Sequence, residues 1–317
     1  MADHSAKETI HRLLSSPKNE DSLDALNYVR EAGLKILFSF ENTKPRDSAE
    51  KEAHLLFSMT ILKCNSIMQI AKGDLLQNSL DNRPSLLIYD PFSIMSIVRS
   101  QFEAFCAFTS IFVHPKTKEE QKLFHLLWVI SRLKYRQRFP ARIPENIQKK
   151  EDEKKQLVQL ESELLQNPFF LNLSSKDQQF IKDRVKAKDW QCYFDGTTVK
   201  KAGWEDLALQ VAGCSEALIN QLYSYLSMST HPSNMSTFQF NDLRKNNTHK
   251  FMTNLGITLS TYISAMLIAD FARINSQARI SFEQLPPIHQ ALLNMLNQIF
   301  RSPTHVINDI HKALLNN

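Results

Sequence analysis

Apolar residues recur every three to four positions along most of this sequence, and this spacing is the strongest constraint on its fold. The spacing predicts amphipathic helices over about 20–40, 47–79, 117–138 and 248–275. Glycine is scarce, with 6 residues in a chain of 317, so few tight hairpins are expected. Apolar residues make up 43% of the chain, which is enough for a packed core. We therefore expect an all-α protein, a multi-helix bundle with a charged helical arm.

The charged stretch QKKEDEKKQLVQLESELL carries only a thin apolar stripe of leucines, which is typical of a solvated helix or hairpin arm. Asp195-Gly196 supplies the turn chemistry of a loop over about 186–203. Prolines predict two short C-terminal helices, one after Pro286-Pro287 and one after Pro303. The expected organisation is a bundle domain over 1–275 with a charged insertion at about 140–200. A helical extension over 276–317 should pack on it.

The segment 91–113, PFSIMSIVRSQFEAFCAFTSIFV, is predicted to be a helix that is apolar nearly all round. Asp90-Pro91 marks its start, with Asp as the N-cap and Pro at the first helical position. Its only charges are Arg99 and Glu103, four residues apart and so on one face. A buried charge is costly unless it is paired and hydrogen-bonded. This pair is therefore expected to point at polar groups inside the protein.

A second predicted helix, over about 204–230, offers those groups. Tyr223, Ser227 and His231 are spaced by four residues and form one polar line along it. His231-Pro232 should end the helix, because the residue before a proline avoids the α region. A polar loop is expected to follow. At a helix C-terminus the dipole favours a charged imidazole.

Two interpretations of these five residues stay open. They form a buried polar network that fixes the helix register, or a site in which His231 moves a proton and Arg99 holds an anion. A solvent-open position would favour the site, and a sealed core position would favour the network.

RSQFEAF on one helix and YSYLSMSTHPS on a later one resemble a bacterial family of uncharacterised helical proteins, domain of unknown function five-six-seven-seven. The family pattern is R-[ST]-x-x-E on an apolar helix, a Trp-led stretch, and then Y-x-x-x-S-x-x-x-H. The matching residues are Arg99, Glu103, Trp204, Tyr223, Ser227 and His231. The resemblance covers roughly residues 50 to 270. It implies a helical fold with a shared polar site, and no particular reaction.

The expected architecture also resembles the HEPN superfamily of helical bundles. Many of its members are metal-independent RNA nucleases, toxins or phage-defence proteins, and their signature is an Arg and a His with four to six residues between them. Arg244 and His249 match that spacing. With fourteen arginines and ten histidines in the chain, chance alone gives about one such spacing. A solvated polar turn that caps the next helix is the simpler explanation.

A basic run with five cations, from Arg132 to Arg142, includes Arg136 and Arg138 and is interleaved with Tyr135 and Phe139. Cations and exposed aromatic rings together are typical of contacts with phosphates and unpaired bases. A charged helix face near a proline turn is the alternative. The net charge of +5 permits a nucleic-acid partner without requiring one.

Several functional classes lack their sequence signatures. The chain has no glycine-rich phosphate loop, no H-E-x-x-H or E-x-x-H spacing and no G-x-S-x-G, so we expect no cofactor and no metal. The four cysteines are expected to be buried thiols. No apolar signal core opens the sequence, and the uncharged stretch 251–269 is better explained by a buried helix than by a membrane span.

The sequence thus predicts a cytoplasmic protein that does not enter a membrane. RNA, a protein partner or a second copy of the chain would be its partner. Its function would be that of a HEPN-like ribonuclease, toxin or phage-defence effector. A helical interaction module or a small-ligand sensor, with a structural polar network, is the alternative.

Overall fold

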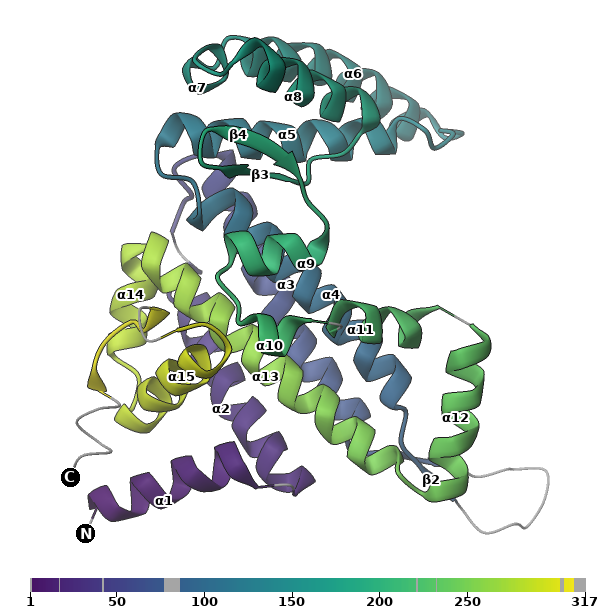
Figure 1. Cartoon of the computed structure of the whole chain (residues 1–317), viewed down its shortest axis with the longest axis vertical. Helices are drawn as coiled ribbons and strands as arrows, with labels where there is room; N and C mark the ends of the chain where they lie inside the picture. Colours follow the sequence, from purple (N-terminus) through teal and green to yellow (C-terminus); the bar gives the residue numbers. More distant parts are fainter. Residues whose placement is uncertain are drawn as a thin grey trace. The chain divides into compact units, whose positions relative to one another are not determined.

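The computed structural model describes residues 2–16, 18–41, 43–76, 86–220, 222–231, 233–302 and 305–310. Most of them lie in helices, which confirms the all-α fold (Figure 1). The two sheets in this part of the chain are short antiparallel hairpins, β1–β2 and β3–β4. The chain forms two units, one from 1–108 together with 213–317 and the other from 109–212. The predicted insertion at about 140–200 thus falls inside a longer unit, and the predicted extension from 276 belongs to the first unit.

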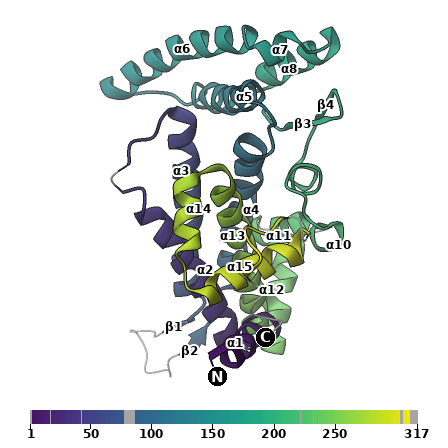
Figure 2. The same ribbon diagram turned by 90° about the vertical axis from the view of Figure 1, so that its left-hand side faces the viewer.

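The first unit holds twelve elements among the described residues. They are α1 (Ala2–Ser15), α2 (Asn19–Phe38), α3 (Ser48–Ile70), β1 (Asp74–Leu76), β2 (Leu86–Ile88), α4 (Pro91–Phe108), α10 (Glu216–Ile219), α11 (Leu222–Thr230), α12 (Asn234–Asn246), α13 (His249–Ile274), α14 (Ser276–Glu283) and α15 (Pro287–Phe300). Helix α13 is their centre, because it packs against α2, α3, α4, α14 and α15 (Figures 1 and 2). Its most apolar stretch is long enough to cross a membrane, but most of that stretch is buried in the protein, as in a core helix.

Close packing of α13 on α4 depends on a missing side chain. A Cβ at Gly256 would collide with Ile94 on α4, so only glycine lets the two helices approach this closely. Met95, Phe102 and Phe105 on α4 are all fully buried, as their apolar spacing predicts. Helix α4 is therefore fixed in the core, and its polar residues are held in defined positions.

A buried ion pair fixes the C-terminal part of this unit. Arg301 donates from Nη1 and Nη2 to the two carboxylate oxygens of Asp270 on α13, at 2.7 Å each. Both side chains are almost completely buried, and the guanidinium also lies over the Phe105 ring, 5.0 Å from its centroid. Arg301 thus anchors the end of α15 to the core.

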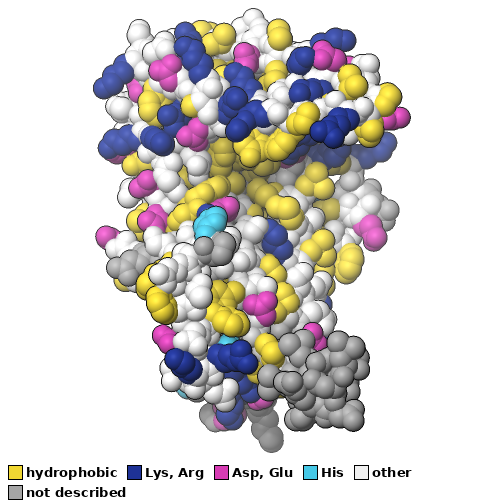
Figure 3. Space-filling view, turned by 90° about the vertical axis from the view of Figure 1, so that its right-hand side faces the viewer, with side chains coloured by type: hydrophobic (Ala, Val, Ile, Leu, Met, Phe, Trp, Pro, Cys, Tyr) yellow, Lys and Arg dark blue, Asp and Glu magenta, His cyan; other side chains and the backbone are white. Residues whose placement is uncertain are grey.

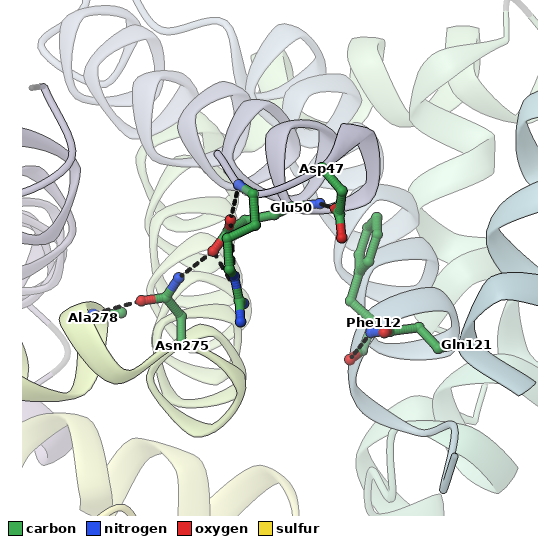
Figure 4. A network of polar contacts seen from close by, with 7 residues as sticks. Asp47, Glu50, Phe112, Gln121, Asn275 and Ala278 are labelled. Carbon is green, nitrogen blue, oxygen red and sulfur yellow. Dashed lines mark hydrogen bonds and ion pairs between the residues drawn. The ribbon is translucent and has the colours of Figure 1, made fainter. Parts of the chain in front are cut away.

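A polar network at the start of α3 joins it to α14 (Figure 4). Asp47 caps α3 by accepting from the Glu50 backbone N–H at 2.8 Å. The Glu50 carboxylate accepts from Arg46 and, at 3.4 Å, from Asn275, which in turn caps α14 through the Ala278 backbone N–H. One carboxylate therefore connects two helix starts.

The second unit contains a π-helical turn η1 (Thr109–Val113), α5 (Lys118–Arg136), α6 (Pro144–Leu165), α7 (Pro168–Leu171), α8 (Ser175–Ala187), β3 (Cys192–Asp195), β4 (Thr198–Lys201), α9 (Trp204–Asp206) and a second π-helical turn η2 (Leu207–Val211). Its own core lies between α5, α6, α7, α8 and the hairpin. Gln121 on α5 donates to the Phe112 carbonyl at 3.1 Å, which ties α5 to η1 (Figure 4). The charged segment is the helix α6, and its Leu157 and Leu164 are buried.

The predicted continuous helix over 204–230 is wrong. The chain breaks it at Gly213, whose φ of +66° is left-handed and cannot continue a helix. A Cβ there would lie 3.1 Å from the His305 ring, so tertiary packing at this position is also tight. The Ser215 backbone N–H then donates to the Phe300 carbonyl at 2.7 Å and leaves the helical path.

Other boundaries differ as well. The predicted helix over 47–79 ends at Ile70 and gives way to the β1–β2 hairpin, and residues 77–79 lie outside the described part. The predicted polar loop after His231 is largely the helix α12, because Ser233 and Ser236 form a capping box. The loop around Asp195-Gly196 is a hairpin with its turn at the expected place. A helix after Pro303 falls mostly outside the described residues.

Candidate functional site

Arg99 and Glu103 face each other on α4, one helical turn apart. Arg99 Nε donates to Glu103 Oε1 at 3.0 Å. The two side chains keep 16% and 30% of their exposure, so the pair lies at the rim of the core and not inside it. The apolar faces of α4 are buried around it. The pair is thus partly solvated, which lowers the cost of its charges.

Helix α11 packs on α4 and brings two further side chains to this pair. Tyr223 Oη accepts from Arg99 Nη2 at 2.7 Å and donates to Glu103 Oε1 at 3.2 Å. Its ring lies under the guanidinium, with Arg99 Cζ 4.9 Å from the ring centroid. His231 Nε2 lies 3.1 Å from Arg99 Nη1. The prediction that these helices pack together through this constellation is confirmed.

Arg99 is the centre of the constellation because each of its three nitrogens has a different partner. A guanidinium only donates hydrogen bonds, so Nε2 of His231 must be the acceptor. A ring nitrogen that can act as a base thus lies beside a fixed cation.

The shifts in pKa agree with this arrangement. Burial works against the charge of Arg99, but hydrogen bonds to Glu103 and Tyr223 raise its pKa above the ordinary value. Burial raises the pKa of Tyr223, against the opposing effect of Arg99, so the phenol keeps its proton. Tyr223 can thus donate to Glu103 while it accepts from Arg99.

The other residues of the proposed family pattern are not part of this cluster. Ser227 lies on α11 between Tyr223 and His231, and its hydroxyl makes no hydrogen bond to the other four residues in the described structure. Trp204 belongs to the second unit, where its ring lies 6.0 Å from that of Trp190. The structure therefore brings together four of the five predicted site residues.

His231 is exposed, in contrast to the core residues around α4. With Arg99 and Glu103 partly exposed, the constellation is open to solvent. A sealed polar network would have buried all of its members. Openness is the feature that favours a site over a purely structural network.

Lys63 on α3 also belongs to this region, and sequence reasoning missed it. Its ammonium donates to the Ser100 hydroxyl at 2.5 Å, next to Arg99 along the chain. Burial lowers the pKa of Lys63, and the nearby charge of Glu103 opposes that fall. The sequence does single out this residue, because Lys63 is the one Lys, Arg, Asp or Glu between residues 53 and 70.

The predicted basic run lies at the end of α5. Arg132 is exposed, whereas Arg136 forms an ion pair with Glu153 on α6 at 2.7 Å. Arg138 lies over the exposed Tyr135 ring, with 5.2 Å from Cζ to the centroid. On the face shown in Figure 3, Lys and Arg side chains gather over the second unit, 109–212, with acidic and apolar side chains among them. Two of the three arginines thus remain available to a partner.

The aromatic residues of this run lie beside each other. The Tyr135 and Phe139 rings are 5.5 Å apart in an edge-to-face arrangement, and 52% and 56% of the two residues is exposed. Exposed rings next to an arginine are the chemistry on which unpaired bases stack.

The second spacing match does not form a pair. Arg244 lies in the last turn of α12 and His249 begins α13, with the left-handed residue Asn247 between them. No hydrogen bond joins their side chains in the described structure. His249 instead lies 6.2 Å from the Phe240 ring.

The structure holds no cluster of three His, Cys, Asp or Glu side chains suited to a metal ion within its described residues. All four cysteines, Cys64, Cys106, Cys192 and Cys214, are buried free thiols as predicted, and burial raises the pKa of each. Neither a family model, nor a curated protein, nor a solved structure matches this chain. The functional argument therefore depends on the site itself.

Proposed function

We propose that this chain is a cytoplasmic HEPN-like ribonuclease of a bacterial toxin or phage-defence system, which cleaves RNA without a metal ion. His231 would act as the base, Arg99 would bind the phosphate, and Glu103 and Tyr223 would hold Arg99 in place. The proposal extends the resemblance of six residues to a family whose own biochemistry is open.

The observation that carries the proposal is the contact between Arg99 Nη1 and His231 Nε2 at 3.1 Å in a solvent-open position. An imidazole next to a fixed guanidinium suits RNA cleavage without a metal ion. One group takes a proton and the other stabilises charge on the phosphate.

The chemistry follows from that pair. An RNA phosphate that binds Arg99 competes for Nη1 and releases the lone pair of His231. The imidazole takes the proton of the ribose 2′-hydroxyl, the 2′-oxygen bonds to phosphorus, and the bond from phosphorus to the 5′-oxygen breaks. That 5′-oxygen leaves with a proton from the imidazolium or from water. The products are a 2′,3′-cyclic phosphate and a 5′-hydroxyl end.

The test is cleavage of single-stranded RNA by the purified chain in EDTA. Mass spectrometry should find 2′,3′-cyclic phosphate ends, and RNA with 2′-deoxy sugars should stay intact because it lacks the nucleophile. Intact RNA after long incubation with the parent protein, at low and at moderate salt, would refute the proposal.

An alternative function, a helical module that binds a protein partner, has its own supporting observation. Helix α12 exposes Met235, Phe238 and Phe240 by 64%, 58% and 49%. Large apolar side chains gathered on one helix are typical of an interaction surface. In that case Arg99, Glu103, Tyr223 and His231 would be structural, and His231→Ala would lower the melting temperature without removing any catalytic activity.

A further inference from the structure

Lys63 is a partly buried cation without an anionic partner. Among the described residues, its one hydrogen bond goes to the neutral Ser100 hydroxyl, at 2.5 Å, and no described carboxylate lies within ion-pair distance of its ammonium. An ammonium has three N–H donors, so two have no protein partner among these residues. A cation taken partly out of water is costly when it is unpaired.

The position of Lys63 suggests what the charge is for. Ser100 follows Arg99 directly on α4, and Glu103 lies close enough for its charge to act on the Lys63 ammonium. Lys63 comes from α3, which packs against α4. The two cations thus approach the same carboxylate from different helices.

Counting charges gives the chemical class of the missing partner. Arg99 and Lys63 contribute two positive charges, and Glu103 contributes one negative charge. One positive charge is left over. A phosphodiester carries one negative charge, whereas a terminal phosphate carries about two at neutral pH. The surplus therefore matches an internal phosphate of a nucleic-acid strand.

We propose that Lys63 is the second phosphate-binding residue of the site, and that with Arg99 it holds the non-bridging oxygens of an RNA phosphodiester. This inference rests on the proposed function for the choice of RNA. Ser100 would keep the ammonium in place in the absence of substrate, and it would give the ammonium up when the phosphate binds. Glu103 would keep the two cations together without neutralising both.

The test separates binding from cleavage. The probe is a short single-stranded oligoribonucleotide with 2′-O-methyl groups throughout, which keeps the phosphodiesters and removes the nucleophile. Its affinity is measured over a series of salt concentrations for the parent and for Lys63→Met. The variant should bind about tenfold more weakly. The slope of log affinity against log salt should fall by about 0.7, the value for one phosphate contact on a single strand.

Three matched variants keep the inference falsifiable. Lys63→Arg keeps the charge and should bind as the parent does. Lys51→Met removes an exposed lysine from the same helix, about 18 Å away along its axis, and should change nothing in affinity. Ser100→Ala should retain affinity, because the hydroxyl only holds the ammonium. Equal losses in Ser100→Ala and Lys63→Met would show that Lys63 acts through Ser100, and would overturn the inference.

Thermal unfolding supplies the readout that a structural role would move. Removal of a partly buried, unpaired charge should leave the melting temperature of Lys63→Met unchanged or higher, while affinity falls. A lower melting temperature with unchanged affinity would refute the inference.

The two proposals can fail separately. A parent that binds the modified strand but leaves unmodified RNA intact would refute the ribonuclease proposal and keep the Lys63 site. A parent that cleaves RNA while Lys63→Met binds as tightly would refute only the Lys63 inference.

Discussion

Replacement of His231 by alanine separates catalysis from stability at the candidate site. The side chain is exposed at the end of α11, and the one hydrogen bond of its ring in the described structure is the 3.1 Å contact with Arg99. Arg99 keeps its bonds to Glu103 and Tyr223 when the imidazole is removed. The variant therefore loses a base and little else.

The expected magnitudes follow from these contacts. One hydrogen bond at a solvent-exposed position contributes about 1 kcal/mol or less to the free energy of unfolding. In a chain of this size that corresponds to a fall of at most about 2–4 °C in melting temperature. Loss of a general base lowers a rate by about 100- to 10,000-fold. Stability should thus barely change while RNA cleavage is abolished.

The assay pairs thermal unfolding with cleavage of a fluorescent RNA in EDTA. His11→Ala, which removes an exposed histidine from α1, is the matched control and should cleave as the parent does. A fall of more than about 6 °C in His231→Ala, beyond what one such bond contributes, would place His231 in a structural network. Undiminished cleavage would refute its role as the base.

Three further changes test other parts of the structure. Asp270→Asn breaks a buried ion pair, so the urea midpoint should fall by the equivalent of about 3–5 kcal/mol; a loss below 1 kcal/mol would contradict the burial of the pair. A triple variant with Gln in place of Arg132, Arg136 and Arg138 should lower the salt slope of RNA binding by about 1.4, the value for two phosphate contacts. Only two contacts are expected because Arg136 is already paired with Glu153. An unchanged slope would show that the end of α5 does not bind RNA. Burial and a neighbouring guanidinium lower the pKa of His305 to about 4 from an ordinary 6.5, so the unfolded chain binds more protons between those values. The free energy of unfolding should fall as pH drops from 6.5 to 4. His305→Gln should reduce this fall, as measured by urea unfolding at several pH values.

The site was predictable because its residues are recognised from their spacing within single helices. Arg99 and Glu103 stand alone in an apolar helix, four residues apart, and that pattern alone requires polar partners. The spacing of Tyr223 and His231 supplies them on one face of a second helix. Side chains at helical spacing keep their face even when the predicted ends of the helix are wrong.

What sequence reasoning missed depends on contacts between distant segments. The left-handed break at Gly213 packs closely against the His305 ring, almost one hundred residues later. Lys63 joins the site only because α3 packs on α4, which no periodicity within α3 reveals. The polar composition of α12 predicts a loop, because its capping box of two serines is a weaker signal than an apolar stripe.

The central position of α13 also has a consequence for synthesis of the protein on the ribosome. Helix α4 ends at Phe108, but the helix that covers its apolar side is complete only at Ile274, about 165 residues later. At a translation rate of about 5–20 residues per second, α13 is completed on the order of 8–33 s after α4. The intervening unit, 109–212, has its own core and can form during that interval. During that interval the nascent chain contains a folded unit that follows α4 in the sequence, while the apolar face of α4 is still uncovered. An exposed apolar face of this kind is a surface that chaperones bind.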